Sequence, residues 1–318
     1  MDTVSVLMST YNGHKYLKQQ IDSILNQRDI NVSLYIRDDQ SSDNTCKILT
    51  DYEKLSNVHV YYGNHLGVIE SFEWLINNIP IESNYFAFSD QDDIWYENKL
   101  CTAVDKIKEV ENKKNSKLVL YACNQNCVDK DGNFRMLRLP KEKIGDNVID
   151  SLIQTEYPAC SMVFTKMIIL KMRYTYKVAK KDLRTMHDAW ALVMAQLMGE
   201  FIYDPQPLMD FRRHDENYTQ GIMYGARTIK DSYNELKYNL KVLKKYKYYQ
   251  GRTAYRARLL IHCFGNDISK NDYLNLKILG LYNKSFLNWF KMIILNPLRK
   301  YYNRPYWKTW LKFFICIY

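Results

Sequence analysis

The sequence predicts an α/β fold in which a mostly parallel sheet is wound with helices. Short apolar runs of the strand type alternate four times with segments whose apolar residues recur at helical spacing, and the connections between them are short. Apolar residues make up 47% and charged residues 25% of the 318 residues. This balance is typical of a globular protein and excludes a largely disordered chain.

Four strands are expected in the first hundred residues, and each ends at a polar segment. They are "VSVLM" (4–8), "VSLYIR" (32–37), "VHVYY" (58–62) and "YFAFS" (85–89). Helical spacing predicts a helix after each of the first three, the second with Ser42 or Asp43 as its N-cap.

The second half of the chain has a looser pattern. Strands are expected at 117–122, at 159–165 and at the "EFIYD" segment that starts at Glu200. A helix is expected over 187–199, with His187 and Asp188 in its first turn and Gly199 at its end.

Three groups of polar residues follow predicted strands. They are Thr10-Tyr11, Asp38-Asp39 and the acids of "SDQDD", Asp90, Asp92 and Asp93. Parallel strands present their carboxyl ends at one edge of a sheet, and ligands bind at that edge. We therefore expect the three groups to form one site.

The three acids in four residues repel one another unless a cation is shared. A polar turn is the alternative interpretation, but it leaves that repulsion unexplained. Oxygen ligands select a hard divalent ion, Mg²⁺ or Mn²⁺, which typically binds one or two carboxylates together with substrate phosphates. The motif therefore favours a metal–diphosphate site.

The segments "STYNG", "IRDDQSSDNT", "GNHLGV" and "FSDQDDIW", in this order and spacing, resemble family 2 glycosyltransferases. Among these they are most similar to the bacterial rhamnosyltransferases of surface polysaccharides. The resemblance is strong over residues 4–100, weaker over 150–221 and absent from the C-terminal tail. It implies the nucleotide-sugar-binding fold called GT-A and an inverting, metal-dependent transfer.

The resemblance also implies roles for the residues at the sheet edge. Thr10 and Tyr11 would line the base and ribose, and one acid of the Asp38-Asp39 pair would bond the pyrimidine edge. Asp90 would face the ribose or a metal-bound water, Asp92 would bind the metal that bridges the diphosphate, and Asp93 would support them. Gln40 stands where the family often has glycine after the acid pair.

Sugar transfer also needs a base that takes the proton of the attacking hydroxyl. In the family this base is an acid that opens a late helix, a position that "MHDAW" matches, so we assign it to Asp188. The alternative is that Asp188 only caps its helix, which aspartate does commonly.

"FRRHDENYTQG" (211–221) resembles the family segment that closes over the diphosphate. Arg212 would neutralise phosphate charge, and His214 would reach a phosphate or the metal, with a solvated polar loop as the alternative for His214. Lys99 and His65 are expected to be ordinary surface residues.

Charge divides the chain at about residue 224. Residues 225–318 hold 19 Lys and Arg against 4 Asp and Glu, a net charge of +15, which leaves −5 for residues 1–224. We expect a GT-A domain over 1–224 and a basic, aromatic, helical extension over 225–318. The extension suits an anionic membrane surface, a nucleic acid or plain solvent. The resemblance favours the membrane, because acceptors in surface-polysaccharide assembly are usually lipid-linked.

The sequence contains no apolar run of the ~18 residues that a membrane-spanning helix needs. The chain opens without a signal-peptide pattern, and its seven cysteines are scattered, so reduced thiols and a cytoplasmic location, peripheral on the inner face of the cell membrane, are expected. The predicted function is transfer of a sugar to a capsule or cell-wall glycan. The donor would be dTDP-L-rhamnose, or alternatively a UDP-hexose. A metal-dependent phosphohydrolase and an RNA-binding protein are the rival classes, and no nucleic-acid partner is expected.

Overall fold

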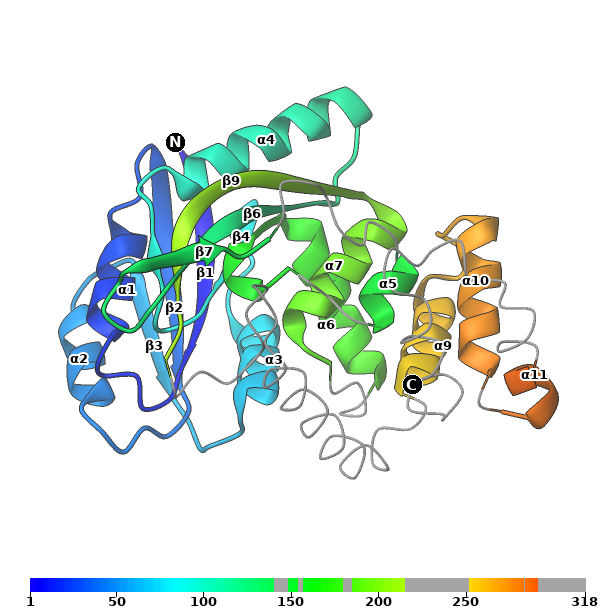
Figure 1. Ribbon diagram of the computed structural model, residues 1–318, viewed down its shortest axis with the longest axis horizontal. Coiled ribbons are helices and arrows are strands. Elements are labelled where there is room, and N and C mark those ends of the chain that lie inside the picture. Colours follow the sequence, from blue (N-terminus) through cyan, green and yellow to red (C-terminus); the bar gives the residue numbers. More distant parts are fainter. Residues whose placement is uncertain (140–147, 154–156, 180–184, 215–251, 283, 291–318) are drawn as a thin grey trace. The chain divides into compact units, whose positions relative to one another are not determined.

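Strand β1 (Asp2–Thr10) lies inside the sheet of the computed structural model (Figure 1). Its side chains are buried on both faces of the sheet. The structure describes residues 1–139, 148–153, 157–179, 185–214, 252–282 and 284–290. Val4, Val6 and Met8 are inaccessible on one face of β1, and Leu7 is inaccessible on the other. Helices must therefore cover both faces, as in other parallel sheets.

The described residues form one mixed sheet. The strand order is β3 (Val58–Tyr62), β2 (Ile30–Asp38), β1, β4 (Tyr85–Ser89), β8 (Met162–Thr165), β6 (Val119–Val128), β9 (Glu200–Arg212) and β5 (Ile94–Trp95), with β7 (Phe134–Leu137) paired to β6. The pairs among β3, β2, β1 and β4 are parallel, as is the pair of β6 and β9. The prediction of a mostly parallel sheet wound with helices is confirmed.

Helices pack on the sheet in two layers. On one face, α1 (Leu17–Leu25), α2 (Thr45–Tyr52) and α4 (Lys99–Lys114) share a core with the even-numbered residues of β1. Elements α3 (Val68–Asn78), α6 (Lys166–Ala179) and α7 (His187–Met198) contact one another, and α3 brings Phe72 against Phe88 of β4. This second layer contains an aromatic cluster in which Phe88 also meets Phe164 of β8.

Two features depart from the expected pattern. A 3₁₀ turn (Ala159–Ser161) occupies the first part of the expected strand 159–165, so β8 begins only at Met162 and runs antiparallel to β4 and β6. The second predicted helix begins at Thr45 rather than beside Ser42 or Asp43. Asp43 still accepts a hydrogen bond from the Thr45 N–H (2.9 Å), so it satisfies that helix end from one residue farther out.

The chain divides into two compact units, residues 1–143 with 155–214 and residues 144–154 with 215–318. In the second unit the structure describes α5 (Val148–Ile153), α9 (Arg252–Phe264), α10 (Lys270–Leu281) and α11 (Phe286–Phe290). Helices α9 and α10 pack together, and Arg258 of α9 donates to the carbonyl of Gly280. The predicted boundary at residue 224 lies outside the described residues. Among those residues, no helix has the length and apolar character needed to cross a bilayer.

Candidate active site at the carboxyl edge of the sheet

Three strands end together at the edge where the candidate residues lie. The register pairs Thr10 of β1 with Asp38 of β2, and Met8 of β1 with Ser89 of β4. The structure therefore brings together two of the polar groups, Thr10-Tyr11 and Asp38-Asp39. The third group, the acidic loop 90–93, begins at the same edge of the sheet.

Asp38 is buried and holds the turn that follows β2. Its carboxylate accepts hydrogen bonds from the Thr10 hydroxyl (3.0 Å), the Ser41 N–H (2.9 Å) and the Ser41 hydroxyl (2.6 Å). Gln40 adopts a left-handed φ of 66°, which explains why glycine suits this position. The Gln40 side chain accepts a hydrogen bond from the His65 N–H (3.0 Å), a contact that glycine cannot make.

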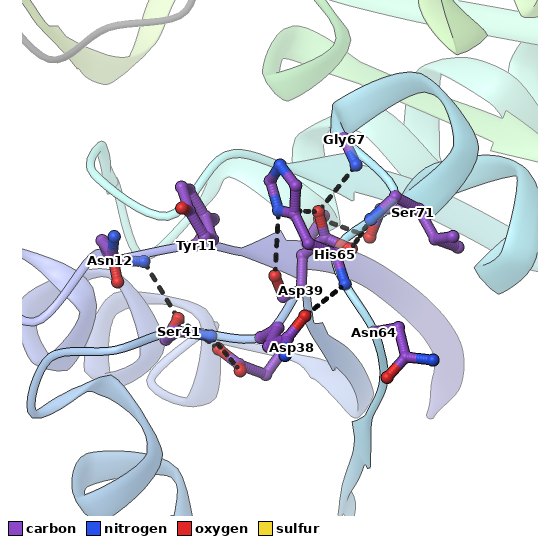
Figure 2. A network of polar contacts seen from close by, with 12 residues as sticks. Tyr11, Asn12, Asp38, Asp39, Ser41, Asn64, His65, Gly67 and Ser71 are labelled. Carbon is purple, nitrogen blue, oxygen red and sulfur yellow. Dashed lines mark hydrogen bonds and ion pairs between the residues drawn. The ribbon is translucent and has the colours of Figure 1, made fainter.

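Asp39 is buried beside Arg37 and anchors the loop 63–67 (Figure 2). It accepts hydrogen bonds from the N–H groups of Leu66 and Gly67, both at 2.8 Å. Burial disfavours the charge of Asp39, but the hydrogen bonds from Arg37 and from these N–H groups outweigh it and lower its pKa. Asp39 is thus a stable anion that the protein itself neutralises.

Tyr11 and His65 expose their rings beside this acid. Their ring centroids lie 4.5 Å apart, and Tyr11 is 46% exposed.

 The side chain of His65 is 52% exposed, and its Nδ1 lies 3.0 Å from the Asp39 carboxylate. The prediction that His65 is a surface residue is therefore right about its exposure, but the ring also belongs to the site.

The acidic loop is held by residues from the end of the long strand β9. The Arg212 N–H donates to Asp93 (3.1 Å), and its guanidinium donates to the carbonyl of Asp92 (3.0 Å). The His214 Nε2 lies 2.8 Å from the Asp92 carboxylate. Arg212 and His214 thus contact the acids directly, from more than a hundred residues away in the sequence. Their predicted contacts with phosphate or metal stay predictions.

Lys99 is fully buried, so the expectation that it lies on the surface is wrong. Its Nζ lies 3.4 Å from the centroid of the Trp95 ring and has no hydrogen-bond partner among the described residues. Burial lowers the pKa of Lys99 to about 8, while the nearby Cys123, Cys160 and Asp93 oppose that shift. A buried ammonium group thus lies within electrostatic range of the acidic loop. The sequence gives little sign of it, because lysine at the start of a helix is usually solvated.

The acids of the loop fit a divalent cation. Asp93 is inaccessible, and its Oδ2 has no hydrogen-bond partner among the described residues. Loss of water and the charge of Asp92 raise the pKa of Asp90 to about 7, and the same causes raise the pKa of Asp93 well above its usual range. Ligand atoms of Asp90, Asp93 and Cys160 lie within 4.8 Å of one another. Carboxylates that the protein compensates only in part suit Mg²⁺ or Mn²⁺.

Asp188 opens α7, as predicted, and is 8% exposed. One carboxylate oxygen accepts a hydrogen bond from the N–H of Ala189 (2.6 Å). Burial raises the pKa of Asp188 to about 6, and its charge in turn raises the pKa of Asp90. Asp188 therefore lies within electrostatic range of the acidic loop, which the sequence alone could not establish.

His187 fixes the first turn of α7 inside the aromatic cluster. Its ring stacks on Phe72 at 3.7 Å between centroids and meets Phe88 edge-on at 4.6 Å. Neither ring nitrogen has a hydrogen-bond partner among the described residues, and burial lowers the pKa of His187 to about 3. A neutral His187 thus packs as an aromatic residue and holds the neighbouring Asp188 in place.

The sequence of this chain is similar to those of known glycosyltransferases. The family model described as "Glycosyl transferase family 2" matches residues 5–169. The dTDP-rhamnosyl transferase RfbG of Shigella flexneri is 30% identical over 224 residues, which cover 66% of this chain and 72% of that protein. The putative teichuronic acid biosynthesis glycosyltransferase TuaG of Bacillus subtilis is 35% identical over 101 residues, or 30% of this chain and 38% of TuaG.

Among solved structures, S. aureus TarS 1–349 in complex with UDP superposes with a TM-score of 0.54 at 16% identity. The superposition covers 99% of this chain and 80% of that one. At this identity the likeness concerns the fold alone, and it confirms the predicted GT-A fold.

The burial of His187 predicts a measurable loss of stability in acid. The unfolded chain binds a proton near pH 6.5 and the folded chain only near pH 3, so folding becomes less favourable as the pH falls through this window. Relative to His187→Phe, which keeps the ring and cannot be protonated, the wild type should lose about 2 kcal/mol more between pH 7 and pH 5. Urea unfolding of both proteins at the two pH values checks this. Equal losses would show that His187 is protonated or solvated in the folded protein.

Proposed function

The chain belongs to glycosyl transferase family 2, and from this premise we propose that it is an inverting, divalent-metal-dependent enzyme that transfers a sugar from a nucleotide donor to a surface glycan. One observation carries the proposal. Asp90 and Asp93 of the loop 90–93 lie at the carboxyl edge of the sheet with raised pKa values, and Asp90 is within electrostatic range of the buried Asp188. A site for a bridging cation and a carboxylate base are the two parts that this reaction needs.

Asp90 and Asp92 would hold the Mg²⁺ or Mn²⁺ ion, with Asp93 beside them. Bound there, the cation would act as a Lewis acid that stabilises the departing diphosphate. Arg212 holds the loop through Asp92 and Asp93, and His214 contacts the Asp92 carboxylate. These contacts support the proposal because they fix the carboxylates before a ligand arrives.

Asp188 would take the proton of the acceptor hydroxyl as its oxygen bonds to the anomeric carbon of the sugar. The bond from that carbon to the diphosphate breaks on the opposite face, so the configuration inverts. A pKa of about 6 leaves Asp188 mostly ionised at neutral pH and more basic than an ordinary aspartate. The proximity of its charge to Asp90 supports a position near the metal–diphosphate site.

The proposed donor is dTDP-L-rhamnose, since RfbG is named a dTDP-rhamnosyl transferase, and a UDP-hexose is the runner-up. Thr10, Tyr11 and the Asp38-Asp39 turn would form the nucleoside end of the donor site. The acceptor would be a growing capsule or cell-wall glycan on a lipid carrier. Screening purified protein for nucleotide release from each donor, with and without acceptor, tests the reaction and identifies the sugar.

We further propose that the basic extension holds the enzyme at an anionic membrane on the cytoplasmic face. Residues 282–318 contain seven Lys and Arg and no Asp or Glu. Within this segment, Phe286, Leu287 and Phe290 of α11 are exposed by 76%, 59% and 44%. Exposed apolar side chains beside basic charge are typical of segments that lie on anionic lipid.

Asp92→Ala should abolish metal-dependent donor binding and leave the fold intact, because it removes a predicted metal ligand from a loop that Arg212 still holds. Calorimetric titration of dTDP and UDP with and without Mn²⁺ measures the effect. Asp105→Ala, at an exposed acid on α4, is the matched control and should bind as the wild type does. If Asp92→Ala keeps the full Mn²⁺ dependence, Asp92 is not a metal ligand.

Asp188→Asn should keep donor binding but lower the transfer rate by ~10²–10⁴, since asparagine preserves shape and capping but cannot accept a proton. In the wild type, kcat/KM should fall with decreasing pH below about 6, where the base becomes protonated. Steady-state kinetics from pH 5 to 8 measure both effects. Near-normal turnover in the variant would leave Asp188 only a structural role.

Deleting residues 282–318 should release the protein from anionic vesicles while nucleotide release from the donor continues. Each Lys or Arg near an anionic surface contributes about 1 kcal/mol of membrane affinity, so the loss of seven should be large. Sedimentation with phosphatidylglycerol vesicles, against phosphatidylcholine vesicles as the control, measures it. A soluble truncation that sediments as strongly as the full chain contradicts membrane binding by this segment.

A further inference from the structure

Arg212 uses its guanidinium to bind the protein itself. Its Nε donates to the Asp92 carbonyl (3.0 Å), its Nη1 to the Lys130 carbonyl (3.1 Å) and its Nη2 to the Gln19 side chain (3.1 Å). The residue is also buried. Every nitrogen of this guanidinium thus has a protein partner. A ligand with negative charge at this edge of the sheet is therefore better served by another arginine.

Arg138 follows β7 and presents a guanidinium without such partners. Its backbone N–H donates to the Gln125 carbonyl (2.9 Å), and its guanidinium carbon lies 4.3 Å from the centroid of the buried Phe211 ring. The residue is partly exposed. No hydrogen bond or ion pair joins its guanidinium to a residue that the structure describes. The N–H groups of this guanidinium are therefore available to a ligand.

A second arginine lies against the same aromatic ring. The Arg213 guanidinium carbon is 5.9 Å from the Phe211 centroid, and the Arg213 backbone N–H donates to the Val128 carbonyl (2.9 Å). Burial and the charge of Arg138 both lower the pKa of Arg213, so the two guanidinium groups repel each other. Two cations that their backbones hold beside one ring suit a phosphate, because its oxygens can accept hydrogen bonds from both.

The charge of Arg138 also reaches the acids of the candidate active site. Burial raises the pKa of Asp188, and the charge of Arg138 opposes that shift. Burial and the charge of Asp92 raise the pKa of Asp90, and Arg138 again acts in the opposite direction. An anion bound at Arg138 would therefore lie close to Asp188, the group that is proposed to take the proton of the acceptor hydroxyl.

We propose that Arg138, together with Arg213, binds a phosphate group of the acceptor next to Asp188. The inference rests on the proposed function and adds the chemical class of the acceptor, a glycan that carries phosphate or is joined to its carrier through phosphate. A phosphate held there orients the acceptor, so that its hydroxyl lies within reach of Asp188. The donor diphosphate is the other source of phosphate at this edge, and the proposed function gives it to the cation of the loop 90–93.

The test measures the binding of two probes to the full chain, with the donor site filled by Mg²⁺ and whichever of UDP and dTDP binds more tightly. The probes are glucose 1-phosphate and methyl glucoside, which share a hexose ring and differ in the phosphate, and NMR titration gives their affinities. The wild type should bind the phosphate probe about tenfold more tightly, the usual effect of charge-assisted hydrogen bonds. Arg138→Gln should bind the two probes within about twofold of each other and keep the wild-type affinity for the nucleotide.

Arg135→Gln is the matched control, since Arg135 of β7 is an exposed arginine that pairs with Asp129. It should keep the wild-type preference for the phosphate probe. Arg138→Lys keeps a positive charge at the site but loses the planar fork, so it should retain part of the preference. This second variant separates a loss of charge from a change in packing on Phe211.

A folded Arg138→Gln protein that still prefers the phosphate probe overturns the inference, and so does a wild type without that preference. An equal loss of nucleotide affinity in Arg138→Gln also overturns it, because the arginine would then bind the donor diphosphate. A wild type that binds neither UDP nor dTDP overturns the proposed function, whereas a missing phosphate preference in a protein that binds the nucleotide overturns this inference alone.

Discussion

Burying a carboxylate costs several kcal/mol unless a cation or hydrogen-bond donors compensate it, and this protein buries Asp38, Asp39, Asp93 and Asp188 near one sheet edge. The acids after β2 are compensated by the protein. Asp39 faces Arg37 and two backbone N–H groups, and its pKa is lowered. The acids after β4 are compensated only in part. Asp93 keeps an oxygen without a hydrogen-bond partner among the described residues, and its pKa is raised.

This difference supports different tasks for the two halves of the edge. The loop 63–67 is already fixed, so a base bound there, as proposed, would meet a rigid surface, and little ordering entropy would be lost. The loop 90–93 carries acids that repel one another. A divalent cation bound with a diphosphate would reduce the repulsion between these carboxylates. Lys99, buried beneath Trp95, supplies some positive charge but no hydrogen bond to a described residue.

The second half of the chain completes the site by bringing distant residues to this edge. Strand β9 runs parallel to β6 and ends at Arg212, whose N–H donates to Asp93. Its course is fixed in part by the Tyr96 hydroxyl, which donates to the Asp210 carboxylate (2.5 Å). Helix α7 brings Asp188 near Asp90 because the neighbouring His187 packs between Phe72 and Phe88. Packing of neutral rings thus positions a charged group.

The sequence by itself determined the wound parallel half of the fold and the chemistry of the edge. Apolar periodicity is local, so it located β1 to β4 and the helices between them, and the clustered acids indicated a cation site. It also located α7 with Asp188 in its first turn.

Only the tertiary structure decided how each charge is compensated. It gave β8 its antiparallel direction, added the short strands β5 and β7, and buried Lys99. It also occupied Asp38 and Asp39 with protein donors and left the His65 side chain half-exposed. These outcomes depend on contacts between residues far apart in the chain, such as Arg212 with Asp93. Local patterns carry no information on such contacts, because burial and hydrogen bonding are properties of the assembled fold.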